Sequence, residues 1–95
     1  MAVKPIPDNY PRVTPYLAID GAAAAIDFYK KAFGATERLR MPGPDGKIGH
    51  AEIEIEGALI MMADEYPPMN FRSPKAIGGS PVMMHMYVSD VDAFF

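Results

Sequence analysis

Two histidines and a row of glutamates are the residues in this chain whose types and spacing could do chemistry. His50 and Glu52 are two positions apart in a segment that alternates polar and apolar residues, so in a strand they share one face. Together with His85 they could hold a divalent cation as a two-histidine, one-carboxylate set. Alternatively, the carboxylate could orient the imidazole as a general base. Residue types alone assign no catalytic residue.

These residues also have structural explanations that involve no chemistry. Alternating glutamates are typical of the solvated side of a strand, which would account for Glu54 and Glu56. His85 lies in a methionine-rich segment, where a histidine is most often partly buried and hydrogen-bonded. Asp64 and Glu65 follow an apolar run and are typical of a solvated pair at a strand end, since no apolar neighbour would raise the pKa of either one.

A short strand, a turn and one amphipathic helix organise the first third of the chain. Residues 16–19 are apolar and stand between Pro15 and an Asp-Gly pair, which is typical of a brief buried strand. We expect Asp20 to cap the helix that follows, at 22–33, because its carboxylate can accept hydrogen bonds from the free amides of the first turn. Apolar residues recur at helical spacing up to Gly34, so one broad helix face is predicted to be buried.

Three further strands are predicted after the helix, at 35–41, 48–56 and 58–63. The middle one is the clearest, because small and branched apolar residues alternate strictly with polar ones. If its apolar face packs on the helix, His50 and Glu52 face the other side of the sheet. The order strand, helix, strand, strand, strand predicts an α+β fold with one βαβββ module.

Three stretches of the chain carry a family resemblance. They read IDFYKKAFGA, GHAEIEIEGALIMMADE and HMYVSDVDAFF, in that order. Together they resemble the vicinal oxygen chelate superfamily, which includes glyoxalase I, bleomycin-resistance proteins, fosfomycin-resistance enzymes and extradiol dioxygenases, and they are most similar to its PhnB-like branch. The resemblance implies a sheet curved around a cup, the helix on its convex side, and a small molecule bound in the cup.

In metal-dependent members of that superfamily, three strand positions supply histidine or glutamate ligands. Matched by position, these places hold Thr14, Met61 and Met83. A hydroxyl and two thioethers bind divalent zinc, nickel or manganese poorly. The resemblance therefore implies a glyoxalase/bleomycin-resistance-like binding protein without the usual metal site. A metal-dependent lyase or dioxygenase of the same superfamily is the alternative, and a purely structural assembly module is a third.

The cup has a predicted lining. Strand alternation from the matched family positions turns polar and aromatic side chains of three strands toward the hollow face. The ligand-binding residues we expect are Tyr16, His50, Glu52, His85 and Tyr87.

The resemblance also divides the chain. A strand at 82–89 corresponds to the first strand, and a helix begins at 90–95, so a second module is opened and left incomplete. The predicted parts are an extended proline-rich N-terminal arm at 1–12, the first module at 13–63, a linker at 64–81 and the start of the second module at 82–95. We expect a homodimer, in which another copy supplies the missing half of the cup, unless the sequence is a piece of a longer chain.

Composition limits the function classes. A net charge of −3 and the absence of any lysine or arginine run argue against nucleic-acid binding. The chain has no cysteine, which excludes disulfides, thiolate catalysis and zinc-thiolate sites. No segment reads as an export signal or a membrane span, so we predict a cytoplasmic protein that does not bind membranes.

Overall fold

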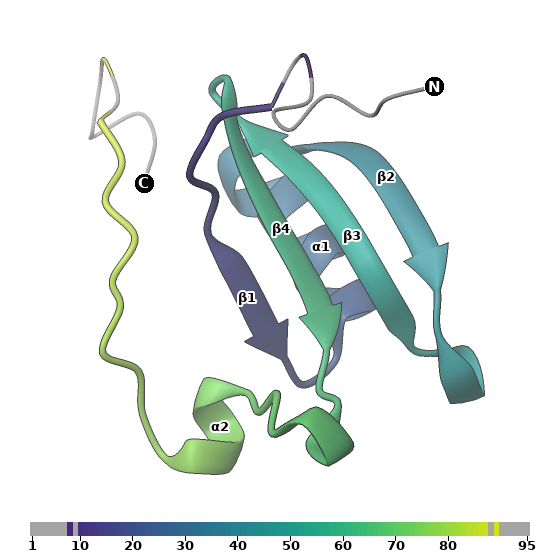
Figure 1. Ribbon diagram of the computed structural model, residues 1–95. Helices are drawn as coiled ribbons and strands as arrows, with labels where there is room; N and C mark the ends of the chain where they lie inside the picture. The colour runs from purple at the N-terminus through teal and green to yellow at the C-terminus, as the bar shows by residue number, and fades with distance from the viewer. Residues whose placement is uncertain (1–7, 9, 88, 90–95) are drawn as a thin grey trace.

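A four-stranded sheet covered on one face by a helix forms the body of the protein (Figure 1). The computed structural model describes residues 8, 10–87 and 89. Its main elements are β1 (Tyr16–Ile19), α1 (Ala22–Phe33), β2 (Thr36–Pro42), β3 (Ile48–Ile55) and β4 (Ala58–Asp64). A short helical turn at Pro44–Gly46 connects β2 to β3, and two more, Pro67–Met69 and α2 (Pro74–Ile77), follow β4.

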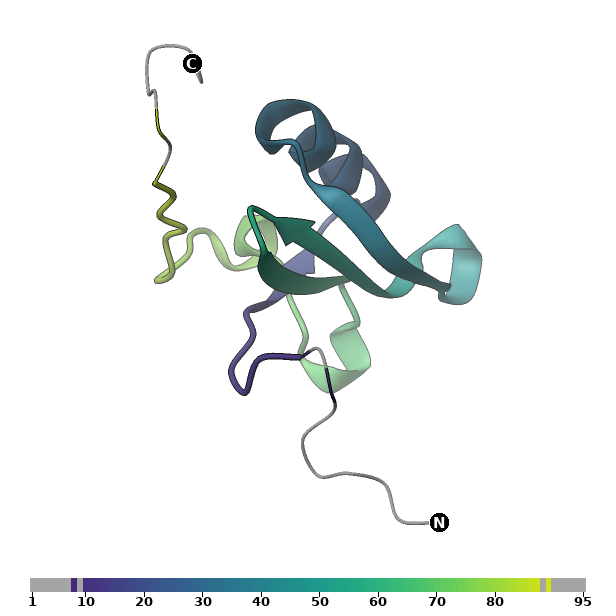
Figure 2. The same ribbon diagram turned by 90° about the horizontal axis from the view of Figure 1, so that it is seen from above.

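The strands lie in the order β1-β4-β3-β2. β1 runs parallel to β4, whereas β3 is antiparallel to both of its neighbours. Because α1 connects β1 to the rest of the sheet, it packs across one face, and the opposite face, called the open face below, carries no helix of this size among the described residues (Figures 1 and 2). The curved α+β fold of one βαβββ module is confirmed, and the ends of its four predicted strands are correct to within one residue.

The core lies between α1 and the sheet. Ile26 of α1 is fully buried against Ile53 of β3 and Met62 of β4, which are also fully buried. Ala51 joins them because it shares a face with Ile53 two residues away. The apolar half of the β3 alternation is thus used by the core, and its polar half is turned to the open face.

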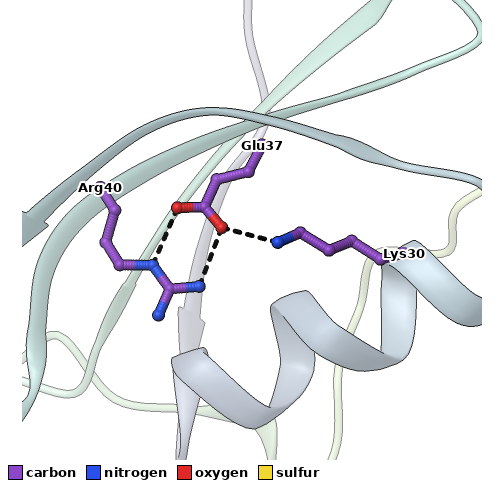
Figure 3. A network of polar contacts seen from close by, with 3 residues as sticks. All are labelled: Lys30, Glu37 and Arg40. Atoms are coloured by element: carbon purple, nitrogen blue, oxygen red, sulfur yellow. Dashed lines mark hydrogen bonds and ion pairs between the residues drawn. The ribbon is translucent and has the colours of Figure 1, made fainter.

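A β-bulge in β2 changes which side chains share a face. The register with β3 shifts between Glu37 and Leu39, so Glu37 and Arg40 both lie on the α1 side although they are three residues apart. Glu37 accepts hydrogen bonds from Arg40 Nη2 and Lys30 Nζ, each at 2.9 Å, and from Arg40 Nε at 3.0 Å (Figure 3). These bonds, Arg40 first, lower the pKa of Glu37. The cluster links the last turn of α1 to β2.

The start of α1 corrects one sequence prediction, because Asp20 does not cap it. The cap position is Gly21, whose φ of 91° lies in the left-handed region that favours glycine. The capping carboxylate is that of Asp64 at the end of β4: its Oδ1 accepts from the amides of Gly21 at 3.0 Å and Ala22 at 2.9 Å. Its Oδ2 accepts from the amide of Ile48 at 2.7 Å. Asp64 is therefore a structural acid and not a solvated pair with its neighbour.

The C-terminal part differs from the prediction. Residues 82–87 form no strand, and Met86 instead packs at the edge of the core. A segment becomes a strand only when it pairs with a neighbouring strand, and the residue pattern of this segment does not provide such a partner. The predicted helix start at 90–95 lies outside the described residues. In the part of the chain that the structure describes, no helix is long and apolar enough to cross a membrane.

Asp64→Asn is expected to lower the free energy of unfolding by about 1–3 kcal/mol at pH 7, because an amide group replaces one of the two accepting oxygens. Burial raises the pKa of Asp64, but the amide hydrogen bonds outweigh it and the net pKa is lowered. A lowered folded-state pKa means that the stabilisation is present above the unfolded pKa and is lost as the pH falls through the folded one. Urea denaturation at several pH values should show the difference shrinking in acid.

Asp20→Asn is the matched control. Asp20 is exposed, and its carboxylate lies 3.5 Å from Lys75 Nζ. We expect this change to alter stability by less than about 0.5 kcal/mol. Equal losses in the two variants would contradict the assignment of the cap to Asp64.

Candidate functional site

Four polar side chains form a hydrogen-bonded row on the open face of the sheet. The Tyr16 hydroxyl lies 2.8 Å from His50 Nδ1, and His50 Nε2 lies 2.9 Å from Glu52 Oε2. The Tyr10 hydroxyl donates to the other carboxylate oxygen, Glu52 Oε1, at 2.8 Å. The row thus joins β1 and β3 to the segment that precedes β1.

Strand register explains why these side chains meet. His50 and Glu52 share the open face of β3 because their neighbours Ala51 and Ile53 are in the core. Glu52 is paired with Met61 of β4, and Met61 is paired with Tyr16 of β1. Tyr16 therefore lies two strands away in the same cross-strand row, and its ring reaches back to His50, with the ring centroids 5.4 Å apart.

Glu52 is the charged residue on which the row centres. It is only 4% exposed. Burial raises its pKa, but hydrogen bonds from His50 and Tyr10, together with the charges of His50 and Arg38, outweigh burial and lower the pKa overall. Glu52 is therefore an ionised carboxylate at neutral pH, buried beneath the open face.

An ionised Glu52 fixes the direction of the two hydrogen bonds that it accepts, and the direction of the Tyr16 bond follows when the imidazole is neutral. A carboxylate only accepts, so His50 Nε2 and the Tyr10 hydroxyl both donate to it. In a neutral imidazole the other nitrogen is then the acceptor, so the Tyr16 hydroxyl donates to His50 Nδ1. Burial, and then the charge of Glu52, raise the pKa of Tyr16, so this phenol keeps its proton. What the row offers a ligand is acceptors: the lone pairs of Tyr16 and the carboxylate of Glu52.

Arg38 is a cation that lies beside this row. The bulge in β2 leaves it beside Glu54, with Arg38 Nε 3.7 Å from Glu54 Oε2. Its guanidinium carbon lies 5.4 Å from the centroid of the Tyr10 ring. Glu54 is thus paired, while Glu56 is exposed in the turn after β3, as expected for a solvated position.

The structure places His85 and Tyr87 away from the row. Their rings contact each other, with centroids 4.7 Å apart in an edge-to-face arrangement, and both side chains are exposed. They border a separate hollow of about 1090 Å³ that also involves Phe28 and Phe33 of α1. Because 82–87 is not paired to the sheet, the predicted approach of His85 to His50 is not formed.

Side chains that commonly bind metals are not clustered in the part of the chain that the structure describes. Among residues 8, 10–87 and 89, no three histidine, aspartate, glutamate or cysteine side chains are grouped so as to hold a metal ion. At the matched positions, Met61 lies in the cross-strand row between Tyr16 and Glu52, and Thr14 and Met83 lie outside the strands. Thioethers and a hydroxyl do not suit a hard divalent cation, so these residues do not fit the metal.

Sequence reasoning missed Tyr10 and Arg38. Tyr10 lies in a proline-rich segment without periodicity, so nothing local indicates where its side chain goes. The position of Arg38 depends on the bulge between Glu37 and Leu39, which cannot be predicted from the sequence of β2. The only signal in the sequence was that Tyr10 and Arg38 had no place in the predicted core.

The fold agrees with the comparison to known families. The family model described as "Glyoxalase/Bleomycin resistance protein/Dioxygenase superfamily" matches residues 11–95, and the chain belongs to that superfamily. It is 49% identical over 88 residues to Mb0911c of Mycobacterium bovis and to Rv0887c of Mycobacterium tuberculosis, both described as uncharacterized. Each match covers 90% of this chain, but 58% and 52% of the relatives, so the chain spans just over half their length.

The proton arrangement of the row can be tested directly. Long-range ¹H–¹⁵N spectra at pH 7.5 should show His50 as the Nε2–H tautomer, because Glu52 accepts from that nitrogen. Tyr16→Phe removes the donor to Nδ1 and is expected to shift the Nδ1 resonance and to cost about 0.5–1.5 kcal/mol of stability. Tyr29→Phe is the control, because Tyr29 lies on α1 and packs against the core, on the opposite face of the sheet from His50. An Nδ1–H tautomer would contradict the arrangement.

Proposed function

We propose that this chain is a small-molecule-binding protein of the PhnB-like branch, which holds its ligand on the open face of the sheet. The observation that carries the proposal is the hydrogen-bonded Tyr16–His50–Glu52 row, in which the carboxylate of Glu52 is buried. Burying an ionised carboxylate is costly unless it is fully hydrogen-bonded, and an open sheet face has no structural need for one. Clusters of this kind, with shifted pKa values, are typical of functional sites.

An apolar hollow beside the row supports the same proposal. Tyr16 borders a hollow of about 570 Å³ that is also lined by Ala63, Met69 and Phe71. The Tyr16 and Phe71 rings meet edge-to-face with centroids 5.7 Å apart. Apolar and aromatic walls with a few convergent polar groups are typical of pockets for small organic molecules. Tyr16 would thus contact both the polar and the apolar part of a ligand.

His85 and Tyr87 are proposed to complete the site only in an assembled form. We propose a homodimer in which residues 13–63 form one module, 64–81 a linker and 82–95 the opening of a second. Large apolar side chains that a monomer would leave in water support it: Met83 is 90% exposed and Phe28 58% exposed. Exposed apolar patches commonly mark contacts with another chain.

A ligand screen tests the binding proposal. We expect small aromatic compounds to raise the melting temperature of the wild-type chain, since a ligand at a hundred times its Kd stabilises by about 2.7 kcal/mol. His50→Ala should abolish the shift produced by such compounds. Glu56→Gln, an exposed change in the turn after β3, should leave it unchanged. Shifts that are the same in all three proteins, or no shifts at all, would contradict binding at this row.

Sedimentation velocity at micromolar concentration tests the assembly. We expect a dimer, and Phe28→Glu should weaken it because a charge would be buried at an apolar contact. Ala24→Glu, at an exposed position of the same helix, is the matched change in charge. A monomer across the accessible concentrations would contradict the homodimer while leaving the binding proposal to the screen.

A further inference from the structure

We propose that Tyr10 occupies a subsite of the ligand site, and that the natural occupant is an aromatic ring bearing an O–H or N–H donor. In this view the segment before β1 is a strap that covers Glu52 until such a ring displaces the tyrosine. The inference rests on the proposed function, and it adds the chemical class of the ligand and a built-in competitor.

The contacts of Tyr10 have the form of ligand recognition. Its hydroxyl donates to Glu52 Oε1 at 2.8 Å, across 42 positions of sequence. The Arg38 guanidinium carbon lies 5.4 Å from the ring centroid, within the distance of about 6 Å at which a cation is attracted to an aromatic face. The Glu52 carboxylate thus binds the hydroxyl donor, and the Arg38 guanidinium lies over the aromatic ring.

Glu52 requires an occupant at this position. Oε2 is taken by His50, so Oε1 of a carboxylate that is 4% exposed depends on a donor from above the sheet. The hydrogen bond to Glu52 is the main cause of the raised pKa of Tyr10, so its phenol stays protonated and donates. Any group that replaces Tyr10 must supply the same donor or leave Oε1 of this buried carboxylate without its hydrogen bond.

The strap is attached in a way that allows exchange. Pro15 lies at its base, where the Pro15 carbonyl accepts from the Met61 amide at 3.0 Å. Pro11 and Pro15 have no N–H, so this segment cannot extend the sheet with a regular ladder of hydrogen bonds. No strand is formed from Tyr10 to Pro15, and Arg12 and Val13 are exposed. Movement of Tyr10 therefore breaks no ladder.

The charges around the subsite select among aromatic compounds. Glu52 is ionised and the Tyr16 oxygen is an acceptor, so donors are favoured near both. A ligand carboxylate at the donor position would meet Glu52 and Glu54 on neighbouring positions of the same strand face. Phenols and anilines fit this position, and benzoates do not.

The experiment uses the side chain itself as the probe. p-Cresol is a tyrosine side chain without its backbone, and toluene is the same ring without the hydroxyl. We expect Tyr10→Ala to bind p-cresol at least tenfold more tightly than wild type in an NMR titration, with shifts at Tyr16, His50 and Glu52. Toluene should bind Tyr10→Ala at least fivefold more weakly than p-cresol.

Two further variants make the test specific. Val13→Ala shortens an exposed side chain of the same segment and should gain no affinity for p-cresol. Adding Glu52→Gln to Tyr10→Ala should weaken p-cresol binding, because the charged acceptor is removed. Far-ultraviolet circular dichroism, with a cooperative urea transition, establishes that each variant is folded before it is titrated.

Equal p-cresol affinity in wild type and folded Tyr10→Ala would overturn the inference, and so would equal binding of toluene and p-cresol by Tyr10→Ala. If either result occurs while the screen still finds ligands whose binding depends on His50, the strap hypothesis is rejected and the proposed function is kept. Loss of His50-dependent hits in the screen would remove the proposed function itself. The two failures are therefore distinguishable.

Discussion

The strict two-residue alternation of β3 is the constraint on which the rest of the structure depends. Ala51 and Ile53 are fully buried beneath α1, and His50 and Glu52 are turned to the other face. A slip of one residue in the pairing of β3 would exchange these two sets. It would place a carboxylate in the core and isoleucine on the open face. Core packing and the polar row are consequently two results of a single register.

Asp64 secures that register at one end of the sheet. Its two oxygens accept from the first amide of α1, from the preceding glycine, and from the first amide of β3. A single side chain thus sets the start of the helix relative to the start of the central strand. This contact positions Ile26 over the sheet, and it leaves Asp64 without a free oxygen for chemistry. Asp64 is therefore structural, whereas the buried Glu52 of β3 accepts no hydrogen bond that holds a helix or strand end.

Local periodicity was enough to predict most of the fold. The helix and the four strands follow from spacings of 3.6 and 2 residues, and the same alternation predicted that His50 and Glu52 share a face. The cap of α1 could not be predicted, because its acceptor is more than 40 positions away from the amides that it binds. Residues 82–87 alternate like a strand, but pairing depends on an edge that their own sequence does not specify. Tyr10 and Arg38 depend on a proline-rich segment and a bulge, neither of which has a period.

The proton arrangement of the row favours binding over proton transfer. Both nitrogens of His50 are engaged, one by an ionised carboxylate and one by a phenol whose pKa is raised. For His50 to act as a base, Tyr16 would have to give up its bond to Nδ1 and then find another acceptor beneath the ligand. A ligand donor of the proposed kind, by contrast, would replace the Tyr10 hydroxyl at Glu52 and could meet the lone pairs of Tyr16 without moving a proton of His50. The row is therefore compatible with the proposed donor-bearing ligand as it stands, whereas a reaction with His50 as the base would first have to break its hydrogen bond with Tyr16.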